Sequence, residues 1–167
     1  WDEALDSEYT VFGEVYDEAA GWSLPFPTEP LEPGGLRVYN LPARDLNHTM
    51  QGRLAYHVRA SIPVTAYQFN PLDNVDVFSN DASLLLPTNV LGVHYLVMTR
   101  EQTFASLRGY VTVLAVRPGE TQVSITVTAP TLVGDGIGHL EPGDTLTRTL
   151  LPYDVLNIET DAIGADL

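Results

Sequence analysis

The feature that most constrains the fold of this chain is an alternation of apolar and polar residues with a period of two. In residues 53–59, the apolar side chains of Leu54, Tyr56 and Val58 recur at every second position, and residues 122–128 repeat the pattern. This is the spacing of side chains along one face of a β-strand. The alternation therefore predicts strands that bury one face and leave the other in water.

Other segments support the same interpretation. Residues 110–116 are apolar at nearly every position, which predicts a central strand that is buried on both faces. Residues 93–98 and 154–158 are further candidate strands, and no segment has a convincing helical period. Pro-Gly pairs, which favour type II turns, occur at 33–34, 118–119 and 142–143. Together these signals predict an all-β, two-sheet β-sandwich of mostly antiparallel strands. Its predicted core consists of Leu54, Tyr56, Val58, Val111, Val113, Val123, Ile125 and Val127.

The chain divides by composition near residue 35. Residues 1–20 are rich in acids, and residues 21–35 contain four prolines and two further glycines at 34 and 35. Prolines at this density exclude a helix or an interior strand. We therefore expect an acidic N-terminal arm and Pro-rich linker over 1–35 and a β-sandwich domain over 36–167, the whole being part of a longer precursor.

The charge balance restricts the possible partners. The chain has 22 acidic and 8 basic residues, a net charge of −14, and all of its bases are arginines. Nucleic acids and anionic membranes prefer a basic surface, so neither is expected as a partner. There is no cysteine for a disulfide or a thiolate site, and no apolar run of about 20 residues for membrane insertion. The lack of lysine favours a GC-rich bacterial genome as the source.

No catalytic motif is present. The sequence contains neither a Gly-x-Ser-x-Gly elbow nor an HExxH motif, and its four histidines are scattered. Residues 134–138 are glycine-rich, but no helix is expected after them to bind a phosphate. The sequence therefore predicts that the protein is not an enzyme.

One cluster of oxygen-bearing side chains suggests a metal. Six asparagine and aspartate residues fall within positions 70–81, and Ca²⁺ prefers six to eight oxygen ligands. The spacing matches no EF-hand loop, and a polar turn explains the same residues. Calcium is the only cofactor that the sequence suggests. The candidate ligands are Asn70, Asp73, Asn74, Asp76, Asn80 and Asp81.

The N-terminal arm contains a second candidate site. Residues 9–16 alternate in a way that allows a strand, which would pair within its own chain or add to the sheet edge of a neighbour. Its candidate partner-binding residues are Tyr9, Val11, Phe12, Val15 and Tyr16. We expect residues 11–15 to be ordered and to pair within their own chain.

Two motifs resemble a known family. They are the segment 63–71, PVTAYQFNP, and the segment 79–89, SNDASLLLPTN. Both are similar to the N-terminal domain family of IgG Fc-binding protein, which includes a branch of bacterial surface proteins. The resemblance extends over about 36–167 and does not cover residues 1–30. It implies an extracellular or cell-surface module for binding or adhesion.

The predicted function follows from that resemblance. We expect a non-catalytic binding or adhesion module at a bacterial cell surface, with a protein or glycan ligand. One alternative is a structural subunit of a surface filament, a homo-oligomer assembled by strand addition through the N-terminal arm. Another is a calcium-dependent carbohydrate-binding domain that uses the turn at 70–81.

Overall fold

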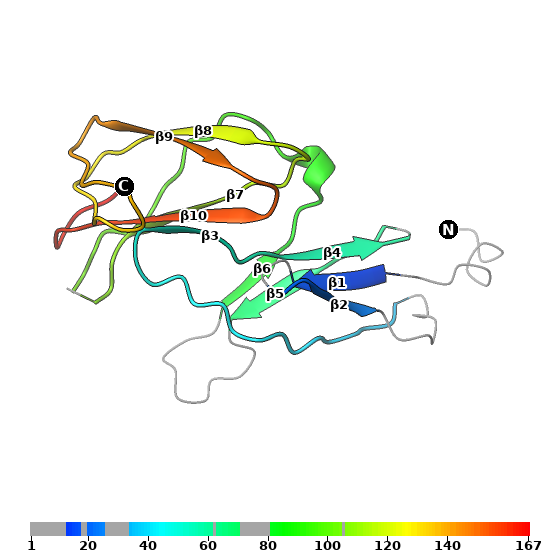
Figure 1. Ribbon diagram of the computed structural model, residues 1–167. Helices are drawn as coiled ribbons and strands as arrows, with labels where there is room; N and C mark the ends of the chain where they lie inside the picture. Colours follow the sequence, from blue (N-terminus) through cyan, green and yellow to red (C-terminus); the bar gives the residue numbers. More distant parts are fainter. Residues whose placement is uncertain (1–12, 18–19, 26–33, 62, 71–80, 105) are drawn as a thin grey trace.

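Figure 1 shows the computed structural model of the chain. The structure describes residues 13–17, 20–25, 34–61, 63–70, 81–104 and 106–167. In these residues the regular structure is β-strand, apart from one 3₁₀ helix, η2 (Thr88–Val90). The prediction of an all-β fold with antiparallel strands is confirmed, and the strands form four small sheets. No helix in the described ranges is long and apolar enough to cross a membrane.

The C-terminal half of the chain forms a three-stranded sheet and a hairpin that covers it. The sheet has the order β3-β10-β7, with β3 at Met50–Arg53, β10 at Asp154–Glu159 and β7 at Tyr110–Leu114. The hairpin pairs β8 (Thr121–Thr126) with β9 (Thr145–Leu150). Figure 1 shows this hairpin as a separate layer beside β7 and β10.

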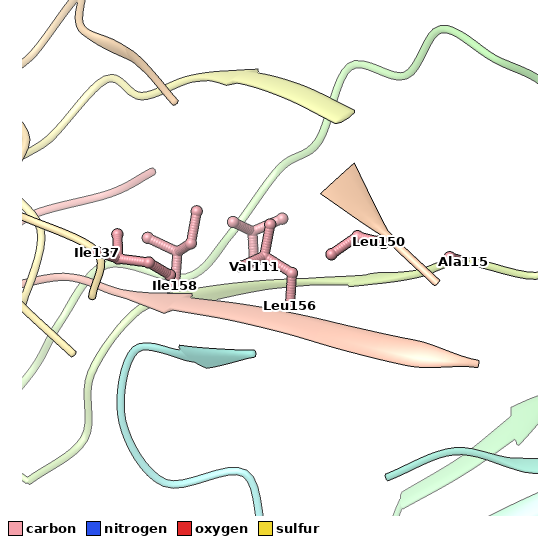
Figure 2. Close-up of a cluster of buried hydrophobic side chains, with 6 residues drawn as sticks. All are labelled: Val111, Ala115, Ile137, Leu150, Leu156 and Ile158. Carbon is pink, nitrogen blue, oxygen red and sulfur yellow. The ribbon is translucent and has the colours of Figure 1, made fainter. Parts of the chain in front are cut away.

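The main hydrophobic core lies between the hairpin and the sheet. Figure 2 shows its fully buried members, which are Val111, Ala115, Ile137, Leu150, Leu156 and Ile158. Partly buried side chains from both layers pack against them, namely Val113, Val123, Ile125, Leu146 and Leu167. The period-two pattern of β8 therefore has the predicted cause, since one face of the strand packs on the sheet, and β9 shows the same alternation of burial.

The central strand of this sheet is not the one that the sequence predicts. Residues 110–116 contain β7, which pairs with β10 alone among the described strands and lies at the edge of the sheet. The side chains of Tyr110 and Leu114 are 62% and 43% exposed. The central strand is β10, which is buried along nearly its whole length although its outer face carries Asn157 and Glu159. Hydrogen bonds allow β10 to hold polar residues where the sequence pattern favours an apolar run.

Most of the predicted core residues are at least partly buried. Val111 and Val127 are buried, and five others are intermediate. Val58 is the exception, at 40% exposed, because β4 belongs to a different sheet. The sequence analysis did not include Leu150, Leu156 and Ile158, which are completely buried.

A buried polar network closes one end of the C-terminal sheet. The hydroxyl of Thr160 accepts a hydrogen bond from the Gly109 amide at 3.0 Å and donates one to Gln102 Oε1 at 2.7 Å. The side-chain NH₂ group of Asn157 donates to the His48 carbonyl at 2.9 Å, and the side-chain oxygen of Asn157 accepts from the Thr112 hydroxyl at 2.7 Å. These bonds compensate for the desolvation of polar groups that water cannot reach.

The N-terminal half contributes a separate three-stranded sheet of order β2-β1-β4. Its strands are β1 (Gly13–Asp17), β2 (Trp22–Pro25) and β4 (Tyr56–Ala60). β1 lies in the middle and pairs on both sides within its own chain, with Val15 opposite both Leu24 and Val58. Residues from the predicted arm (β1) therefore pair both with residues of the predicted linker (β2) and with a strand from beyond residue 36 (β4). A domain boundary at residue 35 stays a prediction.

One aromatic contact connects the two halves. The ring of His57 on β4 stacks on the ring of Tyr153, with centroids 4.6 Å apart and an interplanar angle of 11°. Tyr153 lies in the turn between β9 and β10 and has a φ of 68°, which is uncommon for a residue with a side chain. The Arg53 guanidinium lies 6.0 Å from the centroid of the same ring. The contact places β4 beside the end of the C-terminal sheet.

Candidate binding surface

A two-stranded ribbon presents one apolar face to solvent. It pairs β5 (Tyr67–Asn70) with β6 (Asp81–Leu84). Tyr67 lies opposite Leu84 and Phe69 opposite Ala82, so these four side chains share one face of the ribbon. All four are exposed, as is every other residue of the two strands. We call Tyr67, Phe69, Ala82 and Leu84 the apolar ribbon face.

The chain that follows β6 extends this apolar character without forming a strand. We call residues 85–98 the exposed apolar segment. It contains the 3₁₀ helix η2 and no strand. Its large apolar side chains face water, with Leu96 99% and Met98 93% exposed. The other exposed members are Leu85, Leu86, Val90, Val93, Tyr95 and Val97. The predicted strand at 93–98 is therefore wrong, because no described strand pairs with these residues.

Hydrogen bonds hold both ends of the exposed apolar segment. At its start, the Leu85 amide donates to the Ala66 carbonyl at 2.9 Å, which extends the ladder of the β5–β6 ribbon. Just beyond its end, the Leu167 amide donates to the Thr99 hydroxyl at 3.0 Å, and the Gln102 amide donates to the Ala165 carbonyl at 2.8 Å. The segment is thus anchored while its side chains stay exposed.

Gly109 allows the chain to pass close to the sheet at the second of these anchors. A Cβ atom on Gly109 would lie 2.5 Å from the Arg100 carbonyl oxygen and 3.1 Å from Cγ2 of Thr160. The first distance is shorter than van der Waals contact permits. A glycine is therefore needed for residues 99–102 to lie against the start of β7.

The apolar ribbon face and the exposed apolar segment contain no acidic side chain, although the whole chain is strongly acidic. Residues 46–72 and 82–100 contain no aspartate or glutamate, in a chain with 22 acids. In residues 82–100 the only side chains that can carry a positive charge are His94 and Arg100. An exposed apolar region with little charge is typical of an interaction site.

Comparison with known proteins identifies the family. A family model described as IgGFc binding protein matches residues 81–167, which is more than half of the chain. The chain belongs to this family. No curated protein and no solved structure matches it. The resemblance seen in the sequence is thereby confirmed over residues 81–167, and the family is one of extracellular, non-catalytic binding domains.

The part that matches the IgGFc binding protein family contains the main core and all of the candidate surface except Tyr67 and Phe69, which lie on β5. It covers β6, the exposed apolar segment, β7 to β10 and the C-terminal residues. It leaves out β3, although β3 pairs with β10. The sequence analysis did not recognise residues 85–98 as a binding surface. The sequence feature that indicates this surface is the run of residues 82–100 without an acidic side chain, which is not visible in the acidic composition of the whole chain.

The structure places only two of the candidate calcium ligands. Asn70 and Asp81 lie directly opposite each other at the end of the β5–β6 ribbon. Asp73, Asn74, Asp76 and Asn80 lie outside the described residues. Elsewhere in the described ranges, no group of three or more His, Cys, Asp or Glu side chains is arranged to hold a metal ion. Calcium binding at 70–81 stays a prediction.

The candidate partner-binding strand is described in part. Tyr9, Val11 and Phe12 lie outside the described residues, whereas Val15 and Tyr16 belong to β1. The backbone of both residues is paired with β2 on one side and β4 on the other. For these two residues, the observed pairing lies within their own chain.

Proposed function

We propose that this chain is an extracellular module that binds a protein ligand through the apolar ribbon face and the exposed apolar segment. The observation that carries the proposal is the exposure of so many large apolar side chains on a surface without acids. These side chains follow one another closely in the sequence, and a monomeric soluble protein seldom exposes a large apolar patch unless it binds something. Burial of that patch against a ligand would provide the main free energy of binding.

The composition of the surface suits a protein ligand. Tyr67, Phe69 and Tyr95 are exposed aromatic side chains of the type enriched in the energetic centres of protein interfaces. Met98 has a flexible side chain that adapts to an irregular partner surface. The family description, IgGFc binding protein, makes the Fc part of IgG the first ligand to test.

The test measures binding of the Fc fragment to the immobilised chain by surface plasmon resonance. Leu96→Asp/Met98→Asp introduces two charges at the C-terminal end of the exposed apolar segment, where its most exposed side chains lie. We expect the dissociation constant to rise at least about tenfold, because each buried carboxylate lacks a partner.

A matched control separates this effect from the added negative charge. Leu36→Asp/Ile163→Asp changes two exposed apolar residues outside the proposed surface. This control should bind Fc as the parent does. Lack of Fc binding by the parent would exclude Fc as the ligand, and equal effects of the two double variants would exclude the surface.

The biological setting is part of the same proposal. A binding module of this family on a bacterial cell surface would serve adhesion, with the module displayed by a longer protein. The acidic, lysine-free composition supports a bacterial source. Strand addition through the N-terminal arm receives no support from β1, since both of its edges are paired within the chain.

A further inference from the structure

One strand of the C-terminal sheet has an unpaired edge. Ala115 donates its amide to the Asp154 carbonyl at 3.0 Å, and the Gly109 carbonyl accepts from the Thr160 amide at 2.9 Å. Backbone groups of an antiparallel strand point to alternate sides at successive residues. Residues 109, 111, 113 and 115 therefore face β10. The amides and carbonyls of Tyr110, Thr112 and Leu114 point away from it, where no described strand pairs with them.

This edge lacks the features that usually prevent edge-to-edge pairing. Natural edge strands carry charges, prolines or covering groups that block the addition of another strand. The opposite edge of the sheet has such a feature, because the Gln51 amide of β3 donates to the Asp135 carboxylate at 3.4 Å. β7 contains neither a charge nor a proline. The edge at β3 therefore has a feature that hinders strand addition, whereas β7 has neither a charge nor a proline to hinder it.

We propose that the edge of β7 pairs with the same edge of a second copy of this chain. In an antiparallel pair centred on Thr112, Tyr110 lies opposite Leu114 of the second copy, and Thr112 lies opposite Thr112. Each twofold-related interface then contains two aromatic–aliphatic pairs and one Thr–Thr pair, all of which are favourable across strands. The exposed face of β7 is self-complementary in this register. The resulting sheet has six strands and a closed twofold symmetry.

Charge supports a second copy as the occupant. Residues 102–119 contain no acid and two arginines, so the paired edges bring no acidic side chains together. The net charge of −14 on each copy still opposes association at long range. Salt screens that repulsion over a Debye length of about 8 Å at physiological ionic strength. Dimerisation should consequently strengthen as salt is added, whereas an interface between opposite charges would weaken.

Sedimentation velocity over a range of protein and salt concentrations tests the proposal. Tyr110→Lys/Leu114→Lys places lysines opposite lysines twice, and we expect it to weaken dimerisation by about tenfold or more. These lysines lower the net negative charge, so the loss cannot arise from general repulsion. The control is Leu36→Lys/Val133→Lys, which adds the same charge at exposed apolar positions outside β7. It should retain the dimer.

A charge exchange checks the register itself. Tyr110→Glu/Leu114→Glu should also fail to dimerise, but a mixture with the Lys variant should form a heterodimer, because each lysine then faces a glutamate. A parent chain that stays monomeric at every salt concentration would overturn the proposal. So would a dimer that the Lys variant leaves intact, or a mixture of the two variants that stays monomeric.

Discussion

β10 and β6 show how differently two strands of the same chain are used. Five of the six residues of β10 are buried, whereas all four residues of β6 are exposed. β10 has strand partners on both edges and a hairpin layer against its inner face. Of the strands that the structure describes, β6 pairs with β5 alone. The main core lies in the C-terminal half, between the sheet and the hairpin, whereas both strands of the β5–β6 ribbon keep all of their side chains exposed, as the proposed binding role requires.

The contrast extends to polar residues. Asn157 and Thr160 are buried at and beside β10, and each has named hydrogen-bond partners. The ribbon shows the opposite arrangement, with the aromatic rings of Tyr67 and Phe69 in water. A stable ribbon of two strands normally needs a packed face. The ribbon is therefore the part of the described chain that gains most from a partner.

The largest expected effect is the removal of a core side chain. Leu156→Ala should lower the free energy of unfolding by about 2–5 kcal/mol, because Leu156 is fully buried between the sheet and the hairpin. Leu84→Ala, on the ribbon, should change it by less than about 0.5 kcal/mol. Urea denaturation of the two variants measures the difference. Equal losses would mean that the ribbon contributes to the core.

The next largest loss of stability is expected where the backbones of Gly134 and Thr49 lie close together. A Cβ atom on Gly134 would lie 1.9 Å from the Thr49 carbonyl oxygen, so Gly134→Ala should cost about 3 kcal/mol through displacement of the backbone. Gly138→Ala is the control, since nothing lies within 4 Å of the new atom. Thermal denaturation should separate the two variants clearly. A tolerated Gly134→Ala would show that residues 49 and 134 are not in contact.

The buried polar network should respond more weakly. Thr160→Val keeps the shape of the side chain but leaves the Gly109 amide and Gln102 Oε1 without their partner. We expect a loss of about 1–3 kcal/mol for these unsatisfied buried groups. Thr126→Val removes a hydroxyl that bonds to Thr145 at the surface, and water can replace that bond. The second variant should therefore stay within about 0.5 kcal/mol of the parent.

Calcium should have the smallest effect, and it tests the ribbon. The prediction of a metal site at 70–81 requires calcium to raise the thermal midpoint and a chelator to reverse it. Calcium at a concentration equal to its dissociation constant stabilises the folded state by about 0.4 kcal/mol. Asp81→Ala should abolish the response, because Asp81 faces Asn70 across the ribbon. An unchanged midpoint at millimolar calcium would remove the hypothesis.

The sequence predicted the type of structure better than its arrangement. Alternation identified β8 because one face of that strand is wet, which is the condition under which a period of two appears. It could not identify β10 as the central strand, because Asn157 and Glu159 look like solvent-facing residues until the partners of their side chains, the His48 carbonyl and Arg108, are known. Residues 93–98 look like a strand because apolar residues are normally buried. Their exposure depends on the absence of a paired strand, and no local pattern encodes that.

The pairing of β3 with β10 also determines when the C-terminal sheet can form. Met50 lies opposite Asn157, so the strand that completes one edge is separated from the central strand by more than 100 residues of chain. During synthesis, β3 cannot pair with β10 until the chain has been made as far as Glu159, where β10 ends. Contacts of such long sequence separation slow folding and lengthen the time for which strand edges stay exposed. A fragment limited to residues 81–167 would lack β3 permanently, and we expect it to aggregate through the uncovered edge of β10.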